Sequence, residues 1–488
     1  MAGDLVLGID AGTTAVKAAV FDPRGRRLFD FAAPIPMRRA PGGVAEQDPR
    51  VWLDHVATAL ARVASEGLLA GVGALGLTSQ VNTHVFVDAQ GRPLAPAITW
   101  QDGRAATEAA LLDAGPSAGD RLRWWGAPMP IDASHALSRM SWMARHRPDI
   151  WERTSAVLLP KDFLLRALTG QTVSDPMSNI GLVGPDLAYI PELLALVPGA
   201  AERLAPLRPS AAVAGEAVLA PGLPPVPVAV GIMDAWAGFY GVGLRADGDA
   251  AYLSGTSEVI AGASDRMTGE PGLLVFPRHE GLRVHAGPTQ SGGASVAWFC
   301  AATGQSPEAM SAEVDAAGQD LRTPLFLPHL AGERAPLWDA SARGAFLGLE
   351  AAMGRPAMAR AVFEGVALSA RLLTEALERS TDRRAEVLLC GGGGFRSETW
   401  NRIRADVLGR PLRRAAVADA GVLGAAALGA VAAGLQPDLP AALADLVAYD
   451  RTYEPDPRQA ARYDDLFALY RPAYEALRPL SRALAGRA

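Results

Sequence analysis

One short pattern occurs twice in this chain: an apolar strand, a Gly-Thr turn and a second apolar strand. The first copy is LGIDAGTTAVKAAV at residues 7–20, and the second is AYLSGTSEVIAGA at residues 251–263. Alignment of the copies places the Gly-Thr pair at 12–13 opposite the pair at 255–256. Because strands alternate with helices around the first copy and recur around the second, the pattern predicts an α/β protein with two similar halves.

The second copy sets the predicted domain boundary. A chain of 488 residues is too long for one core, because a domain usually holds about 100 to 200 residues. We place the first domain at residues 1–245 and the second at residues 246–488, with a cleft between them. Within the first domain, residues 121–182 predict a helical insert whose tryptophans serve as core and surface cover.

Composition and charge exclude several classes of protein. The formal net charge is -6, and acidic and basic residues are mixed along the chain, so no nucleic-acid partner is expected. Cys300 and Cys390 lack any metal-binding or disulfide spacing and are predicted to be core residues. The chain shows no signal-peptide pattern and no apolar run of about 18 residues, so we expect a cytoplasmic protein without membrane contact.

The turn DAGTT, residues 10–14, carries groups that suit a phosphate. Backbone N–H groups and hydroxyls can hold phosphate oxygens, and the carboxylate of Asp10 can hold a hydrated Mg²⁺. Hairpin turns also favour Gly and Thr for conformational reasons alone. A single turn of this kind therefore leaves both interpretations open.

A third loop has a composition that suits nucleotide binding. Residues 391–394 are four consecutive glycines between an apolar strand and a predicted helix. Backbone without side chains can approach a flat ligand or a phosphate, and a helix N-terminus adds positive potential. The spacing is neither GxGxxG nor GxxxxGK[ST], so the mechanisms of those motifs do not apply. Three such loops in one chain favour nucleotide binding.

Asp234 lies in VGIMDAWAG, where a strand is predicted to end and a helix of small residues to begin. A carboxylate at that place can act as a helix N-cap or as a general base. The spacing alone leaves these two roles open.

Taken in order, these stretches resemble the FGGY-family carbohydrate kinases, and the overall pattern is xylulokinase-like. The matching segments are GIDAGTTAVKAAVFD, GGVAEQDPRVW, VFVDAQGRPLAPAITWQDGRA, LLPKDFLLRALTG, GIMDAWAGFYGVG, LSGTSEVIAG, FLPHLAGERAPLWD, FEGVAL, GGGGFRSETWNRIRADVLG and GVLGAAALGAVAAG. The resemblance implies two ribonuclease-H-like domains of the actin and hexokinase superfamily flanking a catalytic cleft.

The resemblance also implies roles for individual residues. Asp10 would lie near Mg²⁺, and Asp234 would be the catalytic base that accepts a proton from the sugar. The residues expected to contact ATP are Gly12, Thr13, Thr14, Gly255, Thr256, Gly293, Gly392, Gly393 and Ser397. Those expected to contact the sugar are Gln80, Asn82, Asp102 and Asp234.

The chain departs from the family in the loop that follows one predicted strand. Xylulokinases have roughly Gln-Met-His-Gly there and glycerol kinases Gln-Arg-Glu-Thr, whereas this chain has Gln-Val-Asn-Thr at residues 80–83. Arg139 stands where the family usually has Lys, and Met358 where it has a polar residue. The next residue, His84, is interpreted either as a sugar ligand or as a packing residue.

The sequence therefore predicts an ATP-dependent kinase that transfers the γ-phosphate to a hydroxyl of a small sugar, a ketopentose such as xylulose. A polyol kinase of the glycerol or erythritol type is the alternative, since ITWQDGRA fits both. A non-catalytic nucleotide switch, as in actin, is a third hypothesis, and the presence of Asp10 and Asp234 argues against it. The sequence does not set the oligomeric state, and a homodimer is left open.

Overall fold

The structure, a computed structural model, describes residues 3–126 and 129–486. The contacts within the chain form two compact units. Unit 1 comprises Met1–Gly241, Pro277–Gly281 and Ala420–Val447, and unit 2 comprises Val242–Phe276, Leu282–Asp419 and Ala448–Ala488. The units differ from the domains expected at 1–245 and 246–488, because two segments of the second expected domain pack with the first.

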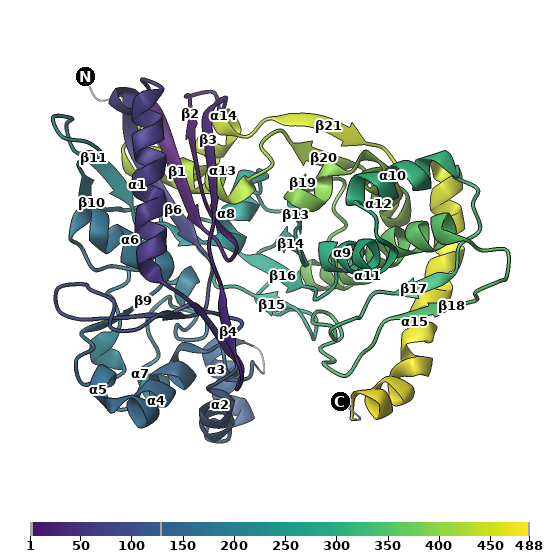
Figure 1. Cartoon of the computed structure of the whole chain (residues 1–488), viewed down its shortest axis with the longest axis horizontal. Coiled ribbons are helices and arrows are strands. Elements are labelled where there is room, and N and C mark those ends of the chain that lie inside the picture. Colours follow the sequence, from purple (N-terminus) through teal and green to yellow (C-terminus); the bar gives the residue numbers. More distant parts are fainter. Residues whose placement is uncertain (1–2, 127–128, 487–488) are drawn as a thin grey trace. The chain divides into compact units, whose positions relative to one another are not determined.

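A seven-stranded sheet forms the centre of unit 1 (Figure 1). Its strands are β1 Leu5–Ala11, β2 Ala15–Phe21, β3 Arg27–Pro34, β6 Val72–Ser79, β10 Val213–Ala217, β11 Val226–Ala229 and β12 Ile232–Met233. The order is β10-β11-β6-β1-β2-β3, and β12 also pairs with β6. Since β1, β11 and β12 run parallel to β6, their carboxyl ends point to one edge of the sheet.

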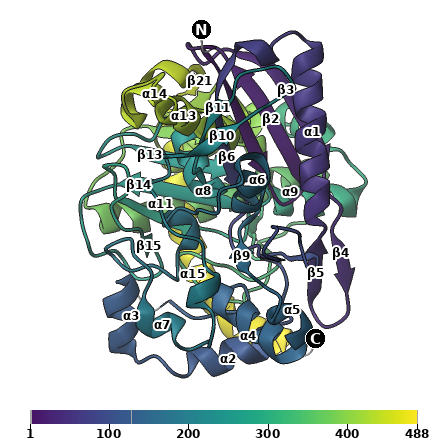
Figure 2. The same cartoon turned by 90° about the vertical axis from the view of Figure 1, so that its left-hand side faces the viewer.

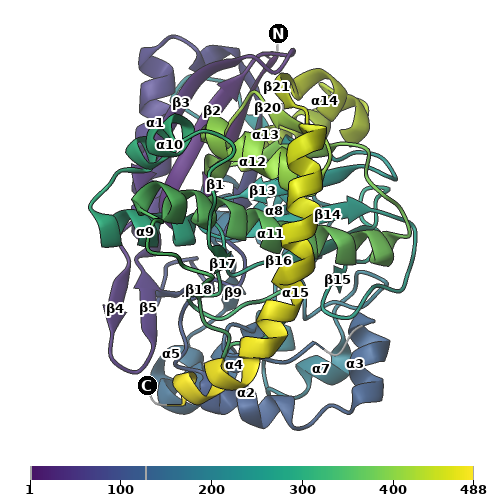
Figure 3. The same ribbon diagram turned by 90° about the vertical axis from the view of Figure 1, so that its right-hand side faces the viewer.

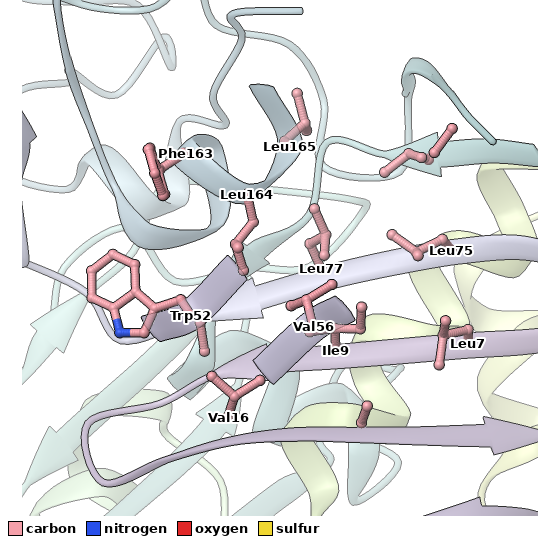
Figure 4. Close-up of a cluster of buried hydrophobic side chains, with 14 of the residues drawn as sticks. Leu7, Ile9, Val16, Trp52, Val56, Leu75, Leu77, Phe163, Leu164 and Leu165 are labelled. Carbon is pink, nitrogen blue, oxygen red and sulfur yellow. The ribbon is translucent and has the colours of Figure 1, made fainter. Parts of the chain in front are cut away.

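Two helices cover one face of this sheet. Helix α1, Pro49–Ser65, begins at the N-cap Asp48, whose side chain accepts a hydrogen bond from Arg50 N. Figure 2 shows α1 running alongside β2 and β3. Its buried Trp52 and Val56 share one apolar core with Phe163, Leu164 and Leu165 of α6, Pro160–Thr169, and with the leucines of β1 and β6 (Figure 4). Burial of each such side chain stabilises the fold by about 1.5 to 3 kcal/mol.

The stretch predicted as a helical insert, residues 121–182, includes the end of α3 Ala118–Trp125, then α4 Ala136–His146, α5 Pro148–Trp151 and α6. The helical region is wider than predicted, since α2 Ala106–Asp113 and α7 Pro191–Leu194 lie on either side of that stretch. Short strands pair beside it: β4 Arg38–Ala40 with β5 Val44–Gln47, β5 with β8 Ala97–Ile98, and β7 Val85–Val87 with β9 Ala156–Leu158. Trp124 and Trp125 are buried in the core of the insert, as interpreted from the sequence.

A helix of small residues from late in the chain completes unit 1. This helix, α13 Ala420–Ala432, contacts β1, β6 and α8 Asp234–Gly241, and α14 Leu439–Leu446 follows it. Its backbone comes so close that a Cβ on Gly8 would lie 2.2 Å from Val422 O, and one on Gly76 1.7 Å from Ala425 O. Glycine at these positions is what lets the helix reach the strands.

Unit 2 repeats the sheet plan. Its seven strands are β13 Ala250–Ser254, β14 Glu258–Ala263, β15 Leu274–Val275, β16 Val284–Pro288, β19 Leu388–Gly391, β20 Leu412–Ala415 and β21 Tyr449–Tyr453, in the order β15-β16-β14-β13-β19-β20-β21. A separate pair is formed by β17 Leu325–Leu327 and β18 Ala345–Leu347. As β1 and β2 do, β13 and β14 pair antiparallel across a Gly-Thr turn.

The described part of unit 2 contains five α-helices. They are α9 Gly293–Thr303, α10 Pro307–Ala316, α11 Arg355–Thr381, α12 Glu398–Leu408 and α15 Pro457–Ala485. Figure 3 shows α15, in yellow, passing α11 and α12, which it contacts. Cys300 and Cys390 are both buried and unbonded to each other, as predicted. Over the described ranges, no helix is long and apolar enough to cross a membrane.

Candidate active site

The first Gly-Thr turn, residues 12–14, directs its carbonyl groups into unit 1. Gly12 O accepts a hydrogen bond from Gln80 Nε2 at 3.3 Å, and Thr13 O accepts one from Gln47 Nε2 at 2.6 Å. Thr14 O accepts from Ile35 N at 2.9 Å. Because the protein occupies all three carbonyls, the opposite edge of the turn, with its N–H groups and hydroxyls, is the edge that can meet an anion.

The second Gly-Thr turn, residues 255–257, has the same arrangement inside unit 2. The first two N–H groups of α9, those of Gly293 and Ala294, donate to Gly255 O at 3.0 Å and Thr256 O at 2.9 Å. Ser257 O accepts from Gly255 N at 2.9 Å. Gly255 and Thr256 are exposed, so this turn too presents its polar edge outward.

Gly293, predicted to contact the nucleotide, packs against Gly255 of the second Gly-Thr turn. A Cβ at this position would lie 2.6 Å from Gly255 O, so only glycine lets α9 begin this close to the turn. The structure thus gives Gly293 a role in holding the second turn, and its direct contact with a nucleotide stays a prediction.

Asp10 ends β1 next to the first turn and is partly exposed. Glycines leave room around its carboxylate: an added Cβ would lie 3.7 Å from Oδ2 at Gly12 and 3.5 Å from Oδ2 at Gly421. Among the residues described, no group of three or more His, Cys, Asp or Glu is arranged to hold a metal ion. A single carboxylate suits a cation that takes its other ligands from water and phosphates.

Asp234 lies at the same sheet edge as Asp10. In the register of the sheet, Asp10 and Ile232 both pair with Thr78 of β6, one on each side, and Asp234 follows β12 directly. Thr78 Oγ1 donates to Ile232 O at 2.6 Å, which fixes β12 against β6. The two carboxylates therefore flank β6, with their strands two strand spacings apart, about 10 Å.

The environment of Asp234 makes it a stronger base than an ordinary aspartate. Burial raises the pKa of its carboxyl from 3.8 to about 6, against the opposing effect of its hydrogen bond from Ala235 N. The predicted strand end and helix start are both present, at Met233 and at Asp234. A carboxylate with a pKa near 6 is ionised at neutral pH and accepts a proton readily.

A buried ion cluster supports the strand that leads to Asp234. Lys161 Nζ contacts Asp162 at 2.6 Å and Asp175 at 2.9 Å, and it donates to Val230 O at 3.3 Å. Burial opposes the charge of Lys161, but the two carboxylates raise its pKa. The sequence pattern assigned no role to Lys161, because its partners are set by the fold.

The four-glycine loop divides into packed and open positions. A Cβ on Gly392, whose φ is 97°, would lie 2.5 Å from Ser254 O, and one on Gly394 would lie 2.1 Å from Ser254 Oγ. Gly393 is exposed, and an added Cβ there meets no atom of the described chain within 4 Å, its neighbours aside. Ser397 accepts from Trp400 N at 3.2 Å and is the N-cap of α12. Of Gly392, Gly393 and Gly394, Gly393 alone thus lacks a packing reason for being glycine.

We expect Gly393→Ala to weaken ATP binding without harming the fold. The methyl group meets open space in the free protein but would intrude on a nucleotide bound to the loop. The KM for ATP should rise roughly tenfold, as an overpacked contact costs about 1 to 3 kcal/mol. Steady-state kinetics and thermal melting test this, with Gly392→Ala as the control that lowers the melting temperature. An unchanged KM for ATP in Gly393→Ala would remove the loop from the nucleotide site.

Gln80, predicted to contact the sugar, is buried and fully engaged with protein groups. Its Nε2 donates to Gly12 O and, at 2.8 Å, to Gln47 Oε1, while its Oε1 accepts from Thr83 Oγ1 at 3.1 Å. Gln47 was missed as a site residue, although it lies in the quoted segment GGVAEQDPRVW. The two glutamines together support the first Gly-Thr turn from within unit 1.

Asp102, also predicted to contact the sugar, is buried and accepts four hydrogen bonds. Ala45 N donates at 2.7 Å, and Arg104 donates through its backbone N at 3.0 Å and its guanidinium at 2.8 and 2.6 Å. Both carboxylate oxygens are therefore in use, and the geometry favours a role in holding this segment in place. Direct contact with a sugar stays a prediction.

Asn82 and Trp100 are more exposed than Gln80 and Asp102. Asn82 is partly exposed with a φ of 52°, which Asn tolerates better than most residues, and its Nδ2 donates to Ser134 Oγ at 3.4 Å. Trp100 is 40% exposed, and its indole N–H donates to Thr13 Oγ1 at 2.9 Å. The structure thus brings an aromatic surface next to the first turn.

His84 is buried and bound to Arg139. The guanidinium donates to His84 Nδ1 at 2.9 Å and also reaches the backbone oxygens of Asn82 and Thr99. Burial lowers the pKa of Arg139 to about 9 and lowers that of His84 well below its usual value. A neutral His84 that accepts from Arg139 favours the packing interpretation, with Arg139 holding together the two segments next to Trp100.

Comparison with known proteins gives matches along nearly the whole chain. Residues 5–241 match the N-terminal domain of the FGGY family of carbohydrate kinases, and residues 250–433 match its C-terminal domain. The xylulose kinase of Escherichia coli K12 is 32% identical, with 98% of this chain and 100% of that protein covered. A glycerol kinase of Gloeobacter violaceus is 30% identical, with 93% of each covered. The crystal structure of xylulose kinase from Rhodospirillum rubrum is 27% identical, with a TM-score of 0.85 and coverage of 98% and 99%.

Proposed function

Because the chain belongs to the FGGY family of carbohydrate kinases, we propose that it phosphorylates a ketopentose such as xylulose at one hydroxyl, with ATP as donor. The family resemblance expected from the sequence is confirmed, and the enzyme is a phosphotransferase with an alcohol group as acceptor. The observation that carries the proposal is the pair of Gly-Thr turns whose carbonyls are all bound by protein, together with the carboxylates of Asp10 and Asp234 at one edge of the sheet in unit 1.

The two turns and the glycine loop would hold the nucleotide. Their exposed N–H groups and hydroxyls suit the oxygens of a polyphosphate, because no carbonyl of either turn is left to repel them. Thr13, Thr14 and Thr256 would contact the transferring phosphate, and Gly393 the adenosine side. In phosphoryl transfer most of the rate enhancement comes from such positioning and charge neutralisation.

Asp10 would hold the Mg²⁺ that accompanies the nucleotide. Gly12 and Gly421 place no side chain against this carboxylate, and Mg²⁺ in such sites takes one or two carboxylates plus substrate phosphates. When bound, the ion neutralises charge on the phosphates. Asp10 fixes it beside the turn, on the same sheet edge as Asp234.

Asp234 would act as the general base. Its carboxylate accepts the proton of the sugar hydroxyl as that oxygen attacks the γ-phosphorus, and the bond from phosphorus to the leaving oxygen of ADP breaks. The raised pKa makes this proton transfer more favourable than for an ordinary aspartate.

The rate should therefore depend on pH through Asp234. Protonation disables the base, so kcat/KM for the sugar should fall about tenfold for each pH unit below about 6 and level off above it. A pH–rate profile from pH 4.5 to 8 checks this, with ATP affinity measured in parallel as a control. A midpoint near pH 4 in this profile would contradict the buried environment assigned to Asp234.

The choice of acceptor rests on the relatives and on the sugar-side residues. The similarity to the Escherichia coli xylulose kinase extends over both whole chains and favours a ketopentose. A polyol such as glycerol or erythritol remains the second candidate, since a glycerol kinase is 30% identical and the loop at residues 80–83 matches neither family pattern.

A coupled assay of ADP release over pentuloses, hexuloses, pentitols, erythritol and glycerol tests the proposal. We expect the highest kcat/KM with a pentulose. A polyol with the highest value would replace the ketopentose assignment, and no turnover with any acceptor would overturn it. The sequence left a homodimer open and predicted a cytoplasmic location, and both remain predictions. Measurements on the purified protein can test the first, and measurements on the cells that make it can test the second.

A further inference from the structure

The second Gly-Thr turn and the glycine loop touch each other inside unit 2. Strands β13 and β19 are parallel neighbours with Leu253 paired to Gly391, so both loops leave the sheet at the same edge. Gly394 lies so close to Ser254 that a Cβ would be 2.1 Å from the hydroxyl oxygen. A shift of one loop must therefore move the other.

One buried arginine binds the glycine loop and both residues that flank the second Gly-Thr turn. Arg404 of α12 donates from Nη1 to Gly394 O at 2.9 Å, and from Nη2 to Ser254 Oγ at 2.7 Å and Glu258 Oε1 at 2.6 Å. The side chains of Arg404 and Glu258 are 0% and 1% exposed. Two nitrogens of one planar group thus reach opposite sides of the contact, which a lysine cannot do.

Both carboxylate oxygens of Glu258 also accept hydrogen bonds at this contact. Its Oε1 accepts from Ser254 Oγ at 2.9 Å and its Oε2 from Tyr252 Oη at 2.7 Å. Burial raises the pKa of Glu258, and the guanidinium of Arg404 counteracts this rise. The guanidinium also lies over the ring of Trp400, 3.6 Å from its centroid, which adds a cation–π contact.

We propose that Arg404 is a positioning residue for nucleotide binding, which sets the second Gly-Thr turn and the glycine loop in one fixed relation by binding Glu258 and Gly394 together. We call this arrangement the Arg404 clasp: Arg404, Glu258, Ser254 and Gly394. Because the Arg404 side chain is fully buried, it would act on the nucleotide through the two loops and not by direct contact. The inference rests on the proposed nucleotide role of these loops.

Arg404→Lys tests the clasp while keeping the positive charge. The ammonium can pair with Glu258 but cannot also reach Gly394 O, so the loops lose their fixed relation. Titration calorimetry with ATP alone should show affinity lower by roughly tenfold, the effect of losing one hydrogen bond to a charged group. In steady-state kinetics the KM for ATP should rise similarly, while the KM for the sugar stays within about twofold.

Arg402→Lys is the matched control on the same helix. Its side chain is half exposed and pairs with Asp315 at 2.7 Å instead of with either loop, so ATP affinity should not change. If Arg404→Lys binds ATP as tightly as the wild type, the clasp has no positioning role. If the wild type binds ATP but turns over no acceptor, the proposed kinase function fails while the clasp stands.

A second variant separates positioning from stability. Arg404→Met with Glu258→Gln removes both charges, so no unpaired ion is buried and the protein should fold. Without a donor to Gly394 O, its ATP affinity should stay low although its melting temperature approaches that of the wild type. Recovery of wild-type ATP affinity in this double variant would show that Arg404 serves stability only, and would overturn the proposal.

Discussion

Asp234→Asn should lower sugar-dependent ADP release by at least about 100-fold, because general-base catalysis contributes typically 10² to 10⁴ in rate. Asparagine keeps the shape of the side chain and its hydrogen bond from Ala235 N, but it cannot take the proton. ATP affinity should stay within a few-fold of the wild type. Initial rates with the preferred acceptor, together with calorimetric titration of ATP, measure both effects.

A true helix cap provides the control for this variant. Asp48 is the N-cap of α1 in the same unit, and Asp48→Asn should leave activity unchanged because Asn caps a helix about as well as Asp. If Asp234→Asn also keeps activity within about threefold of the wild type, Asp234 is a cap and not a base.

The same variant should change stability in a pH-dependent way. Burial raises the folded-state pKa of Asp234 from 3.8 to about 6, so its contribution to stability is complete below 3.8 and is lost as the pH rises through about 6. Asparagine does not ionise, so the variant does not lose this stability as the pH rises. Asp234→Asn should therefore melt at a higher temperature than the wild type at pH 8, and the difference should shrink toward pH 4.

Asp10→Ala should abolish most of the turnover. Removal of one group that stabilises charge in a transition state typically lowers kcat by about 10² to 10³, and we expect a loss of at least about 100-fold. The effect should be largest at low Mg²⁺ concentration, because the variant holds the ion only through the nucleotide. Initial rates over a Mg²⁺ series at saturating ATP and sugar give this measurement.

Asp30→Ala is the matched control for Asp10. Asp30 lies on β3 of the same sheet, and its side chain is 68% exposed, so its loss should change neither the rate nor the Mg²⁺ dependence. Wild-type rates for Asp10→Ala at low Mg²⁺ would refute a metal-holding role for Asp10.

The sequence by itself determined the elements whose signals are local. Both Gly-Thr turns, the glycine loop and the helix start at Asp234 lie where their patterns predicted, because turn chemistry and the alternation of apolar residues act over a few positions. The family and the two-part α/β fold of the actin and hexokinase type followed from the order of the motifs and are confirmed.

Only the tertiary structure decided which predicted residues face outward and which are used inside the protein. Gln80 and Asp102 were expected to contact the sugar, yet their side chains bind other parts of unit 1. Helix α13 comes after most of unit 2 in the sequence but packs in unit 1. It can do so because glycines on β1 and β6, far from it in the sequence, leave room for its backbone. Arg404 and Glu258 are 146 residues apart and meet only in the folded chain. Burial and hydrogen bonding between distant positions depend on the path of the whole chain, which no local pattern contains.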